Sequence, residues 1–530
     1  MNKSHDVCII GAGHNGLVSS IMLARAGLSV KVHEGKKVVG GAAKTENPFK
    51  LAPNLGHSTG AYLLGVMPPE LMSELGLKIN LVRRDPHYFL PTLNDKYLLL
   101  GADSKANDQQ IRSFFSDQDA KAIERLEAEI AMLREDLAPS WLQEPLPLEE
   151  TANKFIRKEL QATFLNLCSS PVEEYLHRFN FKSELLLAMY AVTDGFSGLN
   201  ASFGMKGTGY NFLVHNMCRL PRSGGTWMIA EGGMGAVTNS LKNLAIQEGV
   251  DIETSSNVDE LIITNNRISG VVSDSGLETL AKIDVGACDP FKLMNLATDH
   301  LSEDFKTDLN NKRKMGTTLK LNLALNDLPT FSCLNDRFGQ HKTTSHLLPQ
   351  EEDGSIFDQI KDSYQQVQNC ILADFPTIEL YFHTDAEPSL MDADGRHSAA
   401  LFVQWAPYNI QGSSWDKERL KYENHLIDIA ERFAPDLRQK IDDTFMLAPP
   451  DIESYFGISN GHIHHIDNAF AFDKRSPYKW PLEGLYAGSA GCHPGGSVIG
   501  CSGYNLSLIH ISAPTSRRGI SYAVFCLKKK

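Results

Sequence analysis

Three glycines and one carboxylate near the start of the chain have the types and spacing needed to bind a nucleotide. Gly11, Gly13 and Gly16 stand in G-x-G-x-x-G spacing, and Glu34 follows Gly16 by 18 residues. The first glycine permits a tight turn, the second lets a pyrophosphate approach the backbone, and the third lets a helix pack closely on a strand. A carboxylate at that distance accepts hydrogen bonds from ribose hydroxyls. These residues predict dinucleotide binding, provided that the right elements surround them.

The elements around these residues are readable from the same stretch. Residues 7–10 are an apolar run that suits a buried parallel strand, and residues 17–26 are small and apolar, as in a helix. Residues 28–33 predict a second strand, which ends at Glu34. The free N–H groups at the start of the helix favour anionic phosphates. Strand, helix, strand and acid together predict a complete β-α-β nucleotide-binding unit.

A pair of glycines narrows the choice of nucleotide. Gly40 and Gly41 come six residues after Glu34, in the stretch Val-Val-Gly-Gly-Ala-Ala-Lys-Thr. This stretch resembles the diglycine motif that follows the second strand in FAD-dependent oxidases and desaturases. The resemblance favours FAD over NAD, with a simple flexible turn as the alternative.

The chain length, the net charge and the spacing of the cysteines exclude several classes of function. A chain of 530 residues with 42% apolar and 22% charged residues is expected to fold into two or more globular domains. The net charge of −13 argues against a nucleic-acid partner. There is no apolar run of 18 residues and the first strand begins near residue 6, so a cytoplasmic location without a signal peptide is expected. The nine cysteines are scattered without a C-x-x-C pair, which argues against redox-disulfide chemistry.

Motifs along nearly the whole chain carry a family resemblance. They are Ile10-Gly-Ala-Gly-His-Asn-Gly-Leu, Val39-Gly-Gly-Ala-Ala, Gly232-Gly-Met-Gly-Ala, Ala287-Cys-Asp-Pro, Lys320-Leu-Asn-Leu-Ala, Val403-Gln-Trp-Ala-Pro-Tyr, Asn460-Gly-His-Ile-His-His and His493-Pro-Gly-Gly. In this order they resemble the phytoene-desaturase-like branch of FAD-dependent oxidoreductases and, within it, the group called pyridine nucleotide-disulfide oxidoreductase domain-containing protein 2. The sequence departs from the relatives at Tyr504, where they commonly carry histidine.

The resemblance implies an α/β fold with a discontinuous Rossmann-type FAD-binding domain and an inserted α+β substrate domain. Residues 1–85, 225–295 and 450–505 are expected to form the FAD-binding domain, and residues 86–224 and 296–449 the substrate domain. Within the latter, residues 193–225 are rich in glycine, asparagine and aromatic residues and predict loops. The residues expected to hold FAD are Gly11, Ala12, Gly13, Asn15, Gly16, Glu34, Gly40, Gly41, Val258, Gly488, Gly495, Gly496 and Val498.

Four residues are candidates for catalysis or substrate contact. Lys320 lies on a strand that in related amine oxidases holds a lysine linked by water to flavin N5, and the alternative is a solvated lysine at a strand edge. His464 is a candidate acid or base, with a structural histidine as the alternative. Trp405 and Tyr408 are candidates for the substrate channel, with core packing as the alternative. No metal site is expected.

The leading hypothesis for function is an FAD-dependent oxidoreductase that oxidises a C–C or C–N bond of an apolar or amphipathic substrate by hydride transfer to flavin N5. Two alternatives stay open, a flavin amine oxidase and a non-catalytic module that binds prenylated proteins, like GDP-dissociation inhibitors. The expected partner is an apolar small molecule, with peripheral membrane contact left open. The oligomeric state is not predicted.

The end of the chain differs from its relatives. They continue into an apolar helix, whereas residues 506–530 contain Pro514, β-branched residues, paired arginines and three terminal lysines. This stretch resembles translated sequencing-adapter read-through, so a non-native or disordered tail that packs poorly is predicted from residue 506. A genuine variable tail is the alternative.

Overall fold

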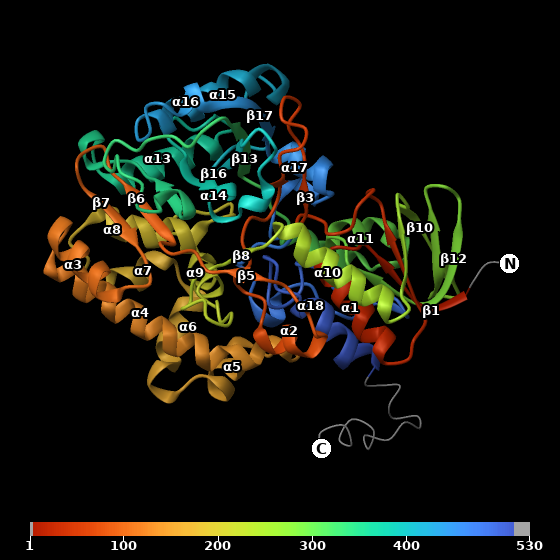
Figure 1. Ribbon diagram of the computed structural model, residues 1–530. Coiled ribbons are helices and arrows are strands. Elements are labelled where there is room, and N and C mark those ends of the chain that lie inside the picture. The colour runs from red at the N-terminus through yellow and green to blue at the C-terminus, as the bar shows by residue number, and fades with distance from the viewer. Residues whose placement is uncertain (1–3, 513–530) are drawn as a thin grey trace.

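The computed structural model describes residues 4–512 and divides their long strands between two sheets (Figure 1). One sheet begins at Ser4, the first described residue, and helices α1 (His14–Arg25), α10 (Met234–Gln247) and α18 (Cys501–Asn505) lie beside it. The other lies above a group of helices that runs from α3 to α9.

The first sheet is built around β1 (Ser4–Ile10), whose residues from Val7 onward are buried. β1 pairs in parallel with β2 on one side and with β12 on the other. The parallel strands run in the order β9–β2–β1–β12–β18, and the hairpin β10–β11 pairs with the first half of β12. The bounds of these strands are Val30–Glu34 (β2), Asp251–Thr254 (β9), Val258–Thr264 (β10), Arg267–Ser273 (β11), Glu278–Gly286 (β12) and Leu485–Ala487 (β18). This is the predicted Rossmann-type sheet, and the predicted α/β fold class is confirmed.

Helices on this sheet are α1 (His14–Arg25), α10 (Met234–Gln247) and α18 (Cys501–Asn505), and both α10 and α18 contact α1. Shorter helices in the same part of the chain are α2 (Pro69–Leu75), α11 (Pro290–Leu296), α12 (Glu303–Asn311) and α17 (Pro449–Phe456). The two-stranded pairs β3–β4 (Thr45–Glu46, His57–Ser58) and β5–β8 (Leu81–Val82, Ile229–Ala230) lie in the connections.

The second sheet has the order β17–β13–β16–β15–β14–β6–β7. Its bounds are Ile441–Leu447 (β17), Thr318–Leu325 (β13), His397–Gln404 (β16), Thr377–Phe382 (β15), Thr344–Leu347 (β14), Tyr88–Pro91 (β6) and Tyr97–Leu100 (β7). One face packs on α15 (Trp415–Glu431) and α16 (Leu437–Lys440) in a single apolar cluster. β13 is buried along its whole length because β16 and β17 flank it on both sides.

A helical group faces the second sheet. It comprises α3 (Ser104–Phe114), α4 (Asp117–Leu137), α5 (Leu148–Phe155), α6 (Gln161–Ser169), α7 (Val172–His177), α8 (Glu184–Tyr190), a π-helical turn over Ala191–Phe196, and α9 (Thr208–His215). Helices α13 (Ile356–Gln368) and α14 (His383–Ala386) lie in connections between strands of the second sheet, α13 after β14 and α14 after β15. The prediction of loops over 193–225 is wrong for α9, because this segment is buried against α6 and the π-helical turn.

The prediction that the tail packs poorly from residue 506 is wrong for its described part, Leu506–Ser512. Residues Leu506–Ser512 continue α18 as a π-helical turn, and Leu506, Ser507 and Ile511 are buried. The Ser507 hydroxyl lies 2.9 Å from the Ser19 hydroxyl on α1. The apolar spacing of this segment supplies a buried face, which outweighs the poor helix propensity of its β-branched residues. The rest of the predicted tail lies outside the described residues.

Among residues 4–512, no helix is long and apolar enough to cross a membrane.

Candidate active site

The turn after β1 contains three glycines, and the steric surroundings differ at each of the three positions. Gly11 has φ of +104°, which disfavours any residue with a side chain. A Cβ on Gly16 would lie 2.1 Å from the Gly11 carbonyl oxygen, so this position requires close backbone packing. A Cβ on Gly13 would meet no atom within 4 Å. Gly13 thus borders open space at the start of α1, where the first N–H groups of the helix have no partner within it.

Glu34 is held at the end of β2 by the glycine turn itself. The Ala12 N–H donates to Glu34 Oε2 at 2.8 Å, and the Lys36 N–H donates to Oε1 at 2.9 Å. Gly40 joins the same turn, because its N–H donates to the Ala12 carbonyl at 2.8 Å and it bridges Gly13. The backbone around Ala12 therefore fixes the predicted ribose-binding acid and the diglycine segment relative to each other.

These residues open onto one large central cavity of about 1820 Å³. Ligand sites commonly enclose about 300–1,000 Å³, so the cavity has room for a dinucleotide together with a substrate. Eight of the predicted cofactor residues line it: Gly11, Gly13, Asn15, Glu34, Gly40, Gly41, Val258 and Val498.

The other predicted cofactor residues lie behind this lining. Ala12 and Gly16 support the turn as described above. Gly488 packs on Leu506, since a Cβ there would lie 2.7 Å from that side chain. Gly495 has φ of +143° beside Asn468. A Cβ on Gly496 would lie 2.4 Å from His464 Nδ1, so this glycine makes room for the histidine.

The wall of the cavity opposite the nucleotide end is a row of side chains across the second sheet. Lys320 on β13 is paired with Phe402 on β16, which is paired with Glu379 on β15. Tyr381 follows Glu379 by two residues on β15, so its side chain lies on the same face of the sheet. Tyr381 is paired with Thr344 on β14, and these two residues form a second row. All five side chains line the central cavity. We call them the sheet wall.

Lys320 is a buried amine in this wall. Burial lowers the pKa of Lys320 to about 7, although the neighbouring Glu379 carboxylate acts to raise it. Its Nζ lies 3.9 Å from the centre of the Tyr62 ring and 4.7 Å from that of Phe402. The structure thus places Lys320 in the interior rather than at a solvated strand edge, and near neutral pH its amine is available both to accept and to donate a proton.

Glu379 is the acidic member of the sheet wall. Burial raises the pKa of Glu379, while a hydrogen bond from Tyr381 and the charge of Lys320 oppose the shift. The Tyr381 hydroxyl donates to Oε2, and the Ser197 hydroxyl lies 3.4 Å from Oε1. The carboxyl group is therefore fixed between the sheet and the helical group.

His464 lines the cavity from the loop that precedes β18. Burial lowers the pKa of His464 to about 3, with further contributions from His462 and His215. Its Nε2 lies 3.4 Å from the Ser197 carbonyl oxygen. The neutral imidazole is thus held between Gly496 and Ser197, which is the arrangement of a positioned hydrogen-bonding group rather than of a charged acid.

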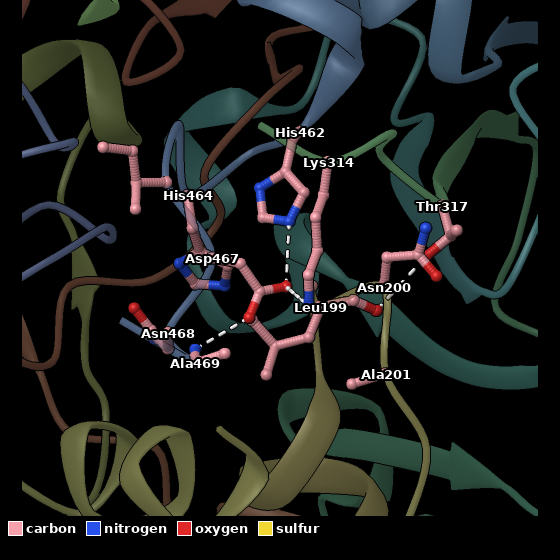
Figure 2. Close-up of polar contacts among 12 residues, drawn as sticks. Leu199, Asn200, Ala201, Lys314, Thr317, His462, His464, Asp467, Asn468 and Ala469 are labelled. Atoms are coloured by element: carbon pink, nitrogen blue, oxygen red, sulfur yellow. Dashed lines mark hydrogen bonds and ion pairs between the residues drawn. The ribbon is translucent and has the colours of Figure 1, made fainter. Parts of the chain in front are cut away.

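A buried carboxylate organises the loop that carries His464 (Figure 2). Asp467 accepts a hydrogen bond from the Ala469 N–H at 2.8 Å, and its Oδ2 lies 3.3 Å from His462 Nε2 and 3.2 Å from Lys314 Nζ. Burial alone would raise the pKa of Asp467, but the bond from His462 and the charge of Lys314 hold it below its usual range. This network fixes the direction in which the loop enters the cavity.

Trp405 and Tyr408 lie away from the central cavity. Trp405 is fully buried, stacks on Phe196, and donates its indole N–H to the Ala201 carbonyl at 3.1 Å. The Tyr408 hydroxyl donates to Glu453. The structure thus gives Trp405 a packing role and brings neither residue to the site.

Among the cavity residues that were not predicted from the sequence are Arg84, Asp194 and Glu379. Glu379 stands alone as a carboxylate in the apolar strand Thr-Ile-Glu-Leu-Tyr-Phe, and that isolation is a signal that could have found it. Asp194 lies in the π-helical turn, and burial raises its pKa to about 7. Nothing in the local sequence distinguishes Arg84 from neighbouring Arg83.

The described residues contain neither a disulfide nor a converging metal-ligand group. The eight described cysteines are free, and Cys288 is one of the residues that line the cavity. Burial raises the pKa of Cys288 to about 12, so its thiol stays protonated near neutral pH. Across residues 4–512, no three His, Cys, Asp or Glu side chains are grouped to hold a metal ion.

The chain is similar to known proteins over almost its whole length. Residues 9–72 match the family described as NAD(P)-binding Rossmann-like domain. The chain is 30% identical over 555 residues to pyridine nucleotide-disulfide oxidoreductase domain-containing protein 2 of Mus musculus, with 95% of this chain and 93% of the mouse protein covered. It is 23% identical over 534 residues to a limonene dehydrogenase polypeptide of Castellaniella defragrans, covering 95% and 94% of the two chains. A solved oxidoreductase from Methanosarcina mazei has a TM-score of 0.63 and 16% identity, over 95% of this chain and 99% of that one.

The residues at the nucleotide end fit FAD, since Gly13 borders open space at a helix start and Glu34 is fixed beside it. FAD is the cofactor. With near-full-length similarity at this level, the chain belongs to the family of pyridine nucleotide-disulfide oxidoreductase domain-containing protein 2, and it is an FAD-dependent oxidoreductase.

Proposed function

We propose that this enzyme oxidises a C–C or C–N bond of an apolar or amphipathic small molecule by hydride transfer to flavin N5. The observation that carries the proposal is the continuity of the central cavity from Gly13 and Glu34 to Lys320 and Glu379. One space therefore serves both the cofactor and the molecule that is oxidised. FAD, when bound, supplies the acceptor for the two electrons and the hydrogen.

The chain's own groups supply binding and proton handling. Ile111 of α3 and Ile123 and Ile130 of α4 line the cavity, and they offer apolar surface to the body of a substrate. Lys320 Nζ can take up a proton released from the substrate, because burial keeps the amine close to half-protonated near neutral pH. Burial keeps the His464 imidazole neutral, so this residue can orient a substrate by hydrogen bonding but adds no charge to its side of the cavity.

A flavin amine oxidase is the second candidate. The observation that favours it is the presence of two buried carboxyl groups in the cavity, Glu379 beside Lys320 and Asp194 in the π-helical turn, which are suited to receive an amine. The name of the Castellaniella relative, a limonene dehydrogenase, instead favours oxidation of a molecule without an amine.

An anaerobic screen tests the proposal. The purified yellow protein is mixed with polyenes, amines and fatty acyl compounds, and loss of flavin absorbance near 450 nm is followed. A substrate should bleach the flavin in the wild type, and Lys320→Met should slow the bleaching while retaining FAD. Bleaching by amines alone would favour the second candidate, and unchanged bleaching in Lys320→Met would remove the lysine from the mechanism.

A further inference from the structure

Arg84 is a buried cation with no ion-pair partner among the described residues. It is only 5% exposed and lines the central cavity. Its Nη1 donates to the Thr344 hydroxyl at 3.0 Å, and its Nη2 lies 3.5 Å from the Trp227 carbonyl oxygen. None of the ion pairs among residues 4–512 includes Arg84, and its Nε has no hydrogen-bond partner in this part of the chain.

Burial of Arg84 without an ion-pair partner in the described part of the chain lowers the stability of the fold when no ligand is bound. A guanidinium stays charged at every pH at which the protein works, and burying an uncompensated charge is strongly destabilising. Burial lowers the pKa of Arg84 only to about 10, so the group keeps its charge near neutral pH. Such a residue is expected to serve a ligand that supplies the missing negative charge.

Glu379 is near enough for its charge to raise the pKa of Arg84, but no carboxylate of the described residues forms a direct ion pair with this guanidinium. Glu379 already accepts hydrogen bonds from Tyr381 and Ser197, and burial raises its pKa toward the neutral form. Asp194 lies beside His215, with Oδ1 3.9 Å from Nδ1. The guanidinium of Arg84 is therefore left without a carboxylate of residues 4–512 in direct contact, while its donors face the cavity.

A long apolar surface runs from the same cavity along α4. Four apolar residues, Ala120, Ile123, Ile130 and Ala131, line the cavity, and their spacing places them on one helical face. Three charged residues of the same helix, Glu124, Glu127 and Arg134, line the cavity beside them. From residue 120 to residue 134 this face extends for about 21 Å at 1.5 Å per residue. It is long enough for an extended chain of more than ten carbons.

We propose that Arg84 and Thr344 form the seat for a carboxylate of the substrate, whose apolar body lies along α4. The substrate class would then be an amphipathic carboxylic acid, which makes the proposed function more specific and rests on it. A carboxylate suits this seat because a guanidinium and one hydroxyl offer several donors to a single planar anion. Thr344 adjoins Tyr381 in the sheet wall, so the seat is built into the same surface as Glu379 and Lys320.

Binding of simple probes to the FAD-loaded enzyme tests the seat without turnover. Decanoate, decylamine and decanol are titrated by calorimetry at pH 7.5, below the concentrations at which they aggregate. Decanoate should bind at least tenfold more tightly than the other two. Arg84→Met should weaken decanoate binding by about 10- to 100-fold, the range for loss of a hydrogen bond to a charged group, and leave decanol unchanged.

The control variants separate this role from a structural one. Arg125→Met removes an arginine of α4 that donates to the Phe179 carbonyl and does not line the cavity, and it should leave all three affinities unchanged. Without ligand, Arg84→Met should unfold at the same temperature as the wild type or a higher one, because an uncompensated buried charge is removed. Thr344→Val should weaken decanoate binding to a smaller degree and provides a second test if Arg84→Met does not fold.

Two outcomes would overturn the proposal. One is tighter binding of decylamine than of decanoate, which would assign the wall to a cation. The other is unchanged decanoate affinity in folded Arg84→Met and Thr344→Val proteins. Decanoate binding without any flavin bleaching by acids would leave the seat in place and count against the proposed oxidation instead.

Discussion

The glycine turn allows one substitution to remove cofactor binding and another to remove stability. A Cβ on Gly13 meets no atom within 4 Å, and its φ of −67° is open to any residue. Gly13→Val should therefore change the free energy of unfolding by no more than about 1 kcal/mol in the absence of FAD. The added side chain would occupy the space in which a phosphate meets the start of α1.

The expected loss of affinity follows from the contacts that the valine blocks. Two hydrogen bonds from backbone N–H groups to a phosphate contribute about 1.5–3 kcal/mol each, so their loss amounts to about 3–6 kcal/mol. That corresponds to a rise in the FAD dissociation constant of about 10²- to 10⁴-fold. Gly16→Ala is the matched control, since its Cβ would lie 2.1 Å from the Gly11 carbonyl oxygen and 2.9 Å from the Ala287 Cβ. It should destabilise the fold by about 1–3 kcal/mol or more through overpacking.

Two measurements distinguish loss of FAD binding from loss of stability. The ratio of released FAD to protein reports retention, and urea unfolding of flavin-stripped protein reports stability. Gly13→Val should be nearly colourless but folded, and Gly16→Ala should unfold at lower urea. A Gly13→Val protein that copurifies with stoichiometric FAD would refute the assignment of the turn to the phosphates.

Three further outcomes follow from the structure. Burial lowers the pKa of Lys320 from 10.5 to about 7 in the folded protein, so between these values the unfolded chain binds more protons and the free energy of unfolding should rise with pH. Lys320→Met should therefore stabilise the protein more at pH 6 than at pH 10 in urea unfolding, and an equal gain at both pH values would contradict this reasoning. Val258→Ala should change the FAD dissociation constant less than about threefold in a fluorescence titration, because we expect this residue to meet the adenine through its backbone, and a loss like that of Gly13→Val would contradict this. A chain ending at 505 should melt at a lower temperature than one ending at 512, since burial of Leu506 alone contributes about 1.5–3 kcal/mol, and equal melting temperatures would restore the view that packing stops at 505.

The nucleotide end was predictable because its information is local. Strand, turn, helix and acid follow one another within residues 6–34, so spacing alone assigns a reason to each glycine. The structure gives Gly11, Gly13 and Gly16 the steric properties that the spacing required. Their contact with FAD stays a prediction.

The sheet wall was not predictable in the same way. Lys320, Glu379 and Phe402 come from three strands whose pairing is fixed by register, and a shift of one residue would turn each side chain to the other face. Sequence alone specifies neither the strand order nor that register. It singled out Lys320 by resemblance and missed Glu379.

Burial also overrode local preference in two segments. Gly209 suggested a loop, yet a Cβ there would lie 2.1 Å from the Leu167 carbonyl oxygen, so the glycine allows α9 to pack tightly on α6. The segment from Leu506 looked unsuited to a helix, yet Leu506 packs against Gly488. In both cases the deciding contacts come from segments distant in the sequence.

The contact between α1 and α18 determines when the cofactor site can form during synthesis. The Ser19 and Ser507 hydroxyls meet across 488 positions of the sequence, and α18 comes so near α1 that a Cβ on Gly503 would lie 2.1 Å from the Asn15 carbonyl oxygen. β18 completes the parallel sheet beside β12. While residues 485–507 are still within the ribosome, the emerged chain exposes the apolar faces that these elements cover. Capture of flavin is therefore expected only once these residues have emerged, and chaperones that shield apolar surface are expected to hold the nascent chain until then.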